Sequence, residues 1–444
     1  MKRSLLLLAL TLSSPGCTSR SPHTPEAATV EAKQASARGD PENEDLVKRA
    51  AKFAWRGDLV RARAELDQLS EARRQVPSLR FLRACIALQA GEFDTVNTLL
   101  DGWKEPKPAE VRLLQQLAAL RQEQPPRDWR LAFSQAWRAA GRPDLRDSSL
   151  LPPSESTLLD SEASGREQAW SRARTDDARF LLALALESDA DRARYALEHL
   201  PESLPPEFLI AAAAVFERDS FPEDVRTHAT RVLRERFTQL AADHPDDMQY
   251  PALALLLGTS LTAPLTSEEL QRIDALSRRS TWRSTDALSL YRAALGPLEA
   301  TGLSPFMAQS FAYTLVVDTL VGPAQWSLRK RSEASQGSLS PEERQRLDEA
   351  LWRIGERMAA QNTLVERFIG VSMMKRSALA RGDTARQAGV AERREDAVRA
   401  QKAAPLPALE RWPLPSLQEA MLEAKLLDEI ATYGDFAAPD EPQP

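Results

Sequence analysis

The sequence contains few of the side chains from which proteins build disulfide frameworks and metal sites. Its 444 residues include two cysteines and four histidines. Two cysteines cannot form a disulfide framework, and no two histidines have the short helical spacing that would place two metal ligands side by side. Phosphate-binding loops, dinucleotide-binding glycine motifs and nucleophile elbows are also missing. We therefore expect no metal ion, no cofactor and no enzymatic activity.

An excess of positive charge and long apolar runs are missing as well. The chain has 58 basic and 64 acidic residues, a net charge of −6, whereas a nucleic-acid-binding protein would show a basic face. No apolar run is long enough to span a bilayer. The alternation typical of strands is almost absent, and apolar residues instead recur at intervals of three and four. The sequence predicts an all-α fold and no nucleic-acid partner.

Residues 1–16 have the pattern of a secretory signal peptide. A basic head, Met1-Lys2-Arg3, precedes an apolar run from Ser4 to Leu12, and small residues then lead to Cys17. This arrangement resembles the processing site of bacterial lipoproteins, in which the cysteine is acylated and becomes the first residue. The resemblance implies lipidation at Cys17, and Thr18 after it implies an outer-membrane anchor facing the periplasm. An ordinary signal peptide that contains a cysteine is the alternative.

Composition divides the remaining chain into regions that we expect to fold and regions that we do not. Residues 17–44 and 434–444 lack apolar periodicity, which predicts a flexible tether and a disordered acidic tail. Residues 143–165 are rich in proline and serine and predict a linker. The expected folded regions are a helical repeat unit at 45–142 and a helical C-terminal body at 166–433.

An internal repeat lies between Leu46 and Trp103. Apolar and small residues recur in register, and the turns at Gly57-Asp58-Leu59 and Gly91-Glu92-Phe93 are 91 − 57 = 34 residues apart. This pattern resembles the tetratricopeptide family. The resemblance implies an α-solenoid of stacked helical hairpins, in which the first helix of each pair lines a groove that receives extended peptides or partner helices. Gly382-Asp383 copies the turn once more.

The implied groove would present Lys48 and Trp55 from one helix and Leu82 and Gln89 from the next. Lys48 and Trp55 are seven residues apart and share a helix face. An exposed tryptophan beside a lysine suits a peptide anchor, and packing of Trp55 between the helices is the alternative. Cys85, on the second helix, has the spacing of a small buried hydrophobe.

Polar caps and prolines mark the expected helix starts. The sequences that begin at Thr266 and Ser340 each place a hydroxyl three residues before a glutamate, as in a capping box. Further starts are expected near Pro108, Asp128, Asp176, Pro206, Pro222, Ser284, Ser304, Thr363 and Ser416.

Two short sequences suggest chemistry only weakly. His228 has Asp224 one turn earlier, which would orient an imidazole, although a solvated helix surface more often has this spacing. Glu155-Ser156 resembles the catalytic pair of lytic transglycosylases. That family continues with a glycine, leucine, methionine and glutamine segment, whereas this chain continues with Arg166-Glu167-Gln168-Ala169, so we do not assign that activity.

Charged residues in the C-terminal body call for partners. Asp318 lies in an apolar run and, if buried, needs an arginine or a backbone donor. Arg329-Lys330-Arg331 predicts a solvated helix end, with contact to anionic lipid head groups as the alternative.

Taken together, these patterns favour a lipid-anchored scaffold or adaptor of the cell envelope that binds a protein partner through the repeat groove. One alternative is a periplasmic enzyme, which would need a deep cleft in the C-terminal body with convergent carboxylates or His228. Another is a helper lipoprotein for a secreted or surface protein.

Overall fold

The computed structural model describes residues 41–152, 163–185, 189–218 and 220–437, and within these ranges the chain is helical and has no β-strand. The all-α prediction is confirmed. The only strand-like contact in these ranges is an isolated bridge between Asp247 and Thr281. Of the helices described, none combines the length and the apolar character needed to cross a membrane.

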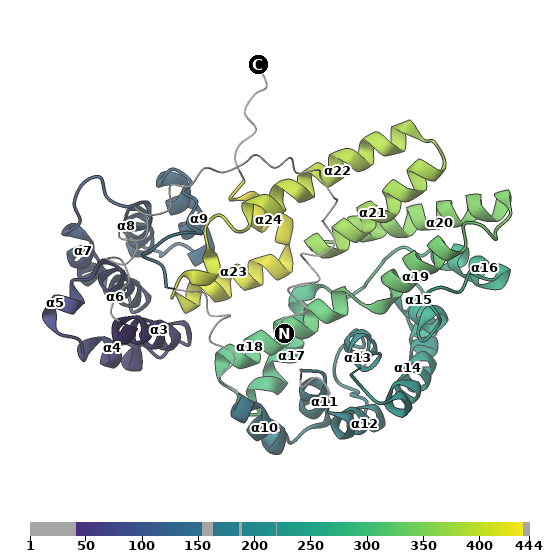
Figure 1. Ribbon diagram of the computed structural model, residues 1–444, viewed down its shortest axis with the longest axis horizontal. Helices are drawn as coiled ribbons and strands as arrows, with labels where there is room; N and C mark the ends of the chain where they lie inside the picture. Colours follow the sequence, from purple (N-terminus) through teal and green to yellow (C-terminus); the bar gives the residue numbers. More distant parts are fainter. Residues whose placement is uncertain (1–40, 153–162, 186–188, 219, 438–444) are drawn as a thin grey trace, which may run out of the picture. The chain divides into compact units, whose positions relative to one another are not determined.

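The N-terminal helices, α3 to α9, pack mainly on their neighbours in the chain (Figure 1). They are α3 (Pro41–Trp55), α4 (Leu59–Asp67), α5 (Glu71–Arg74), α6 (Pro77–Gln89), α7 (Phe93–Asp101), α8 (Ala109–Gln122) and α9 (Trp129–Ala139). Buried side chains on α8 and α9 recur at helical spacing, so each of these two helices buries one apolar face. Helix α6 is buried on several sides, because its residues belong to two hydrophobic cores.

The two glycine turns of the repeat have the same geometry. Gly57 and Gly91 have φ of +74° and +76°, which only glycine adopts at little cost. After each glycine the next amide reaches back into the helix: the amide of Asp58 donates to the carbonyl of Phe53 at 3.0 Å, and that of Glu92 to Ala87 at 2.9 Å. The sequence repeat therefore corresponds to a structural repeat of the helix end.

The same turn follows two further helices. Gly141, after α9, and Gly382, after α21, also have positive φ, and the following amides donate to Trp137 and Ala378 at 3.0 Å. The copy expected at Gly382 is confirmed, and Gly141 is one that the 34-residue spacing did not reveal.

Most expected helix starts are confirmed. Thr266 and Ser340 form complete capping boxes with the glutamates three residues later. The start expected at Ser284 lies slightly later in the chain, because Asp286 is the residue whose carboxylate accepts the amide of Ser289, at 2.8 Å. Asp286 is the better cap here because its side chain satisfies a free donor of the first turn.

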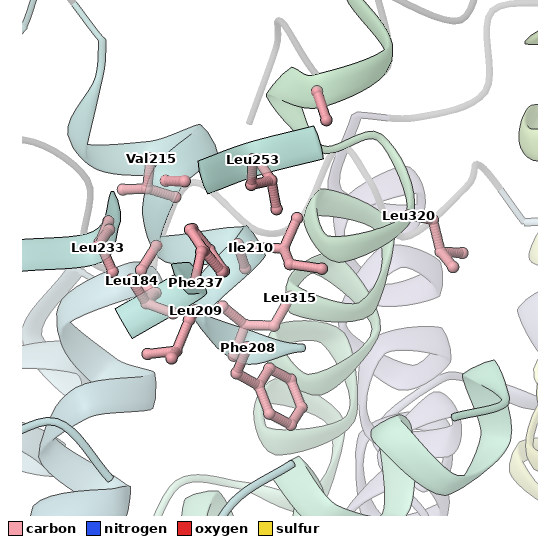
Figure 2. Close-up of a cluster of buried hydrophobic side chains, with 14 of the residues drawn as sticks. Leu184, Phe208, Leu209, Ile210, Val215, Leu233, Phe237, Leu253, Leu315 and Leu320 are labelled. Atoms are coloured by element: carbon pink, nitrogen blue, oxygen red, sulfur yellow. The ribbon is translucent and has the colours of Figure 1, made fainter. Parts of the chain in front are cut away.

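The main hydrophobic core is built on α13, whose side chains are apolar on every face. Figure 2 shows Phe208, Ile210 and Val215 of α13 among leucine and phenylalanine side chains of the helices around it. The helices of this region are α10 (Ala163–Arg172), α11 (Asp176–Ala185), α12 (Ala190–Glu198), α13 (Phe208–Phe216), α14 (Glu223–Asp243), α15 (Gln249–Leu256), α16 (Ser267–Leu276), α17 (Ala287–Glu299), α18 (Pro305–Leu320), α19 (Pro323–Ala334), α20 (Pro341–Ala359) and α21 (Leu364–Ala380).

The end of the chain returns to the N-terminal helices. After α22 (Thr384–Ala403) come a short 3-10 turn (Leu409–Arg411), α23 (Pro415–Leu427) and α24 (Glu429–Gly434). A second hydrophobic core joins buried side chains of α6 to α9 with Trp412, Leu414 and Phe436. We call residues 403–437 the C-terminal segment.

This return corrects three boundaries. The linker expected at 143–165 is wrong for residues 143–152, because Leu145, Leu150 and Leu151 are buried in the second core. The disordered tail expected at 434–444 is wrong for residues 434–437, because Phe436 is fully buried. The division into 45–142 and 166–433 is wrong at its C-terminal end, since the C-terminal segment shares a core with the N-terminal helices. Two further bounds are wrong by a few residues: α3 begins at Pro41, within the tether expected at 17–44, and α10 begins at Ala163, within the expected linker. Residues 1–40, 153–162 and 438–444 lie outside the described ranges.

Helices α20 and α21 lie side by side (Figure 1) and approach each other closely at two glycines. A Cβ atom at Gly370 would lie 2.4 Å from the carbonyl oxygen of Gly355 and 2.5 Å from the amide nitrogen of Ala359. Both contacts are to backbone atoms, which cannot rotate away. Glycine at this position is therefore what permits the close approach.

We expect Gly370→Ala to lower the free energy of unfolding by about 2–3 kcal/mol, because the added methyl forces the two helices apart. Gly389→Ala on α22 is the matched control. It lies in an exposed helix interior with nothing within 4 Å of the added atom, and we expect it to raise stability by up to about 1 kcal/mol. Urea unfolding of both variants checks this, and equal effects would contradict the close approach.

Candidate functional site

Trp55, expected to be an exposed anchor in a partner groove, is buried against the protein's own C-terminal segment. Its residue exposure is 5%, and its indole Nε1 donates to the backbone carbonyl of Trp412 at 2.9 Å. The alternative, that Trp55 packs inside the fold, is the one that the structure shows.

Trp412 is the centre of this contact. Its side chain is fully buried, with its ring edge-on to Phe81 of α6 at 5.7 Å and to Phe133 of α9 at 5.3 Å between centroids. Its own Nε1 donates to the carbonyl of Pro407 at 3.0 Å, so the indole is buried without losing its hydrogen bond. Aromatic pairs in such geometry add stability beyond the area that they bury.

Gln89, the second polar residue expected in the groove, holds the start of α23. Its side-chain amide donates to the hydroxyl of Ser416 at 2.7 Å, and its side-chain oxygen accepts the backbone amide of Ser416 at 3.3 Å. The second bond satisfies one of the free amide groups at the first turn of α23.

The remaining groove residues do not form an open surface either. Leu82 is buried among side chains of α3, α4 and α6, and Lys48 is half-buried. Cys85 is fully buried, as expected, and burial raises the pKa of its thiol. The predicted groove that presents Trp55, Leu82 and Gln89 to a separate protein is wrong, because Trp55 and Gln89 bind the C-terminal segment and Leu82 lies in the core.

Arg411 fastens the C-terminal segment to the residues that we expected to form a linker. Its guanidinium donates to five backbone carbonyls, including those of Arg146 at 2.7 Å, Ser148 at 2.7 Å and Leu151 at 2.6 Å. The other two are the carbonyls of Leu145 and Pro152. Five donors in a planar fork suit a loop whose carbonyls converge.

The last described residues are held by both charge and apolar contact. Asp435 accepts from Arg130 at 2.6 Å and lies 3.4 Å from Arg138, both on α9. The ring of Phe436 lies edge-on to Trp137, 5.3 Å between centroids. The N-terminal helices therefore bind a peptide segment through backbone-directed hydrogen bonds, an aromatic pocket and an ion pair, and that segment belongs to the same chain.

His228 does not pair with Asp224 as the spacing suggested. Asp224 forms an ion pair with Arg194 at 3.0 Å, and the Nδ1 of His228 lies 3.2 Å from the guanidinium of Arg231. Arg231 is one of seven residues that line a surface pocket of about 640 Å³ between α14 and Gly258. Glu223 is the one carboxylate in that lining.

One fully buried carboxylate of the C-terminal body forms an ion pair with a buried arginine. Glu366 is fully buried and accepts two hydrogen bonds from Arg283, at 3.2 and 3.1 Å, with a third from the hydroxyl of Thr363 at 2.8 Å. No motif in the sequence indicated this pair. Asp318 lies 3.7 Å from Arg218, the kind of partner that its position required.

The basic sequence at 329–331 divides between the core and the surface. Arg331 is buried and pairs with Glu269 at 2.6 and 2.7 Å, so the solvated helix end is wrong for this residue. Arg329 and Lys330 instead lie over the ring of Trp326, at 4.7 and 5.0 Å from its centre. Trp326 is 46% exposed.

Within the described residues no cluster of His, Cys, Asp and Glu has the geometry of a metal site. Glu155 and Ser156 lie outside the described ranges. Comparison with protein-family models, curated proteins and solved structures finds no match to this chain.

We expect Trp412→Ala to lower the free energy of unfolding by about 3–5 kcal/mol, because it empties a pocket between α6 and α9. Trp326→Ala, the same substitution at an exposed position, should change the free energy of unfolding by no more than about 0.5 kcal/mol.

Trp55→Phe keeps an aromatic ring but removes the donor to the Trp412 carbonyl. We expect it to lower the free energy of unfolding by about 1 kcal/mol. Chemical denaturation of the three variants checks the order, and a Trp412 variant as stable as the Trp326 variant would contradict it.

Proposed function

We propose that the protein is a lipid-anchored adaptor of the bacterial cell envelope that binds a protein partner through the surface around Trp326. The lipoprotein-like sequence at Cys17 supports the anchor and an outer-membrane, periplasm-facing location, although residues 1–40 lie outside the described ranges. The tetratricopeptide-like repeat supports a binding role, since such arrays bind proteins. We choose Trp326 for the partner surface because Trp55 and Gln89, expected to bind a partner, bind the C-terminal segment instead.

The observation that carries this proposal is the exposure of Trp326 with two cations stacked on it. An indole that is nearly half exposed loses much of the burial that would stabilise it. Tryptophan and arginine are the side chains most enriched at the energetic centres of interfaces. Val321, at the end of α18, is also exposed and lies five residues before the indole in the chain, which adds to the apolar area of this region.

The charges around Trp326 indicate the chemistry of the partner. Arg329, Lys330 and Arg376 all lie within 4 Å of a single carboxylate, Glu333. Together these four side chains carry an excess of positive charge. A partner that covers the indole with an apolar pocket and surrounds it with acidic side chains would match both features.

We expect Trp326→Ala to lose a stoichiometric envelope partner that the unchanged protein retains. The measurement is capture through a C-terminal tag after brief crosslinking and gentle solubilisation of membranes, with the bound proteins identified and quantified. Leu131→Ala is the matched control, because Leu131 is an exposed apolar residue on α9 and is not among the residues grouped around Trp326.

Loss of the same partner from the Trp326 variant, with retention in the Leu131 variant, supports an interface at Trp326. A partner that binds both variants equally, or a protein that is recovered alone from every sample, would overturn the proposal. Because Trp326 is exposed, the variant should fold normally, and a thermal unfolding curve on the same preparation verifies this.

A further inference from the structure

The surface pocket on α14 has a lining dominated by hydrogen-bond donors. It is formed by Glu223, Arg226, Thr227, Thr230, Arg231 and Arg234 of α14 together with Gly258 in the loop after α15. The lining contains no large apolar side chain. A pocket of this composition is not suited to an aromatic or lipid-like ligand, which would need apolar walls.

Arg231 and Arg234 lie on one face of α14 with the two threonines of the lining. Residues 227, 230, 231 and 234 recur at intervals of three and four, so they lie together along one side of α14, while Val225, Ala229 and Leu233 face the core. Arg231 contacts only the ring nitrogen of His228, and Arg234 only the carbonyl of Ala254, at 3.3 Å. Neither has a carboxylate partner among the residues that the structure describes.

Gly258 brings backbone into the wall of the pocket opposite these arginines. It has a φ of +69°, and a Cβ atom there would lie 2.3 Å from the methyl group of Thr230, so the loop rests directly on α14. The amide of Gly258 is occupied, because it donates to the side chain of Glu217 at 2.9 Å. Burial raises the pKa of the Glu217 carboxyl.

From this lining we propose that the pocket binds a compact oxyanion, with Arg231 and Arg234 as the principal ligands and Thr227 and Thr230 as hydroxyl donors. Planar guanidinium groups match the paired oxygens of phosphoryl and carboxylate groups. The pocket volume of about 640 Å³ admits a small polyanion. Arg231 and Arg234 both line the pocket and have no carboxylate partner among the described residues, which suits an anionic ligand. This site is separate from Trp326 and does not depend on the proposed adaptor function.

The test measures binding of pyrophosphate and of citrate to the full chain by titration calorimetry at constant ionic strength. Arg231→Gln/Arg234→Gln should weaken binding by about ten-fold or more, because two charge-assisted contacts are lost. Arg236→Gln is the matched control. Arg236 is exposed on the same helix, donates to Gln239 at 2.9 Å and does not line the pocket, so this variant should bind as the unchanged protein does.

Tighter binding of pyrophosphate would assign the natural ligand to the phosphoryl class, and tighter binding of citrate to the carboxylate class. Either result, lost in the double variant and kept in the Arg236 variant, supports the site. No saturable binding of either anion up to about 10 mM, or equal weakening in the double variant and in Arg236→Gln, would overturn it. All three substituted side chains are exposed, and circular dichroism confirms that each variant is folded.

Discussion

The burial of Trp412 between α6 and α9 is the contact on which the arrangement of this protein depends. Its indole fills the centre of the second core, and its carbonyl is held by the indole of Trp55. Large aromatic side chains contribute most of the stabilisation of such cores. Because Trp412 lies far along the chain from these helices, its burial also fixes the C-terminal segment in place. Arg411, the residue before it, donates to backbone carbonyls within residues 145–152.

This closure determines where ligands can bind. The side chains that resembled a peptide groove, Trp55 and Gln89, are occupied by the segment that contains Trp412 and Ser416. They recognise backbone carbonyl and amide groups, as a peptide-binding groove does, but the peptide belongs to the chain itself. The two sites that we propose for other molecules, the Trp326 surface and the arginine-lined pocket of α14, both lie in the C-terminal body rather than in the repeat.

Local features of the fold could be predicted from the sequence, and distant contacts could not. The capping boxes at Thr266 and Ser340 and the turn at Gly57 depend on residues within one helical turn, so their side-chain chemistry is enough. The pairing of Trp55 with Trp412 spans 357 positions, and no local pattern reports it. The proline- and serine-rich composition of 143–152 was misleading for the same reason, because its order comes from Arg411 and from the second core.

The most direct test of this account is to cut the chain between residues 153 and 162 with an inserted protease site and ask whether the two pieces stay together. The account predicts one 1:1 particle on size-exclusion chromatography in native buffer, because the second core joins α6 to α9 with the C-terminal segment. The same cut in a Trp412→Ala chain should release the N-terminal piece at much lower denaturant. Separation of the pieces of the otherwise unchanged protein in native buffer would contradict the central claim.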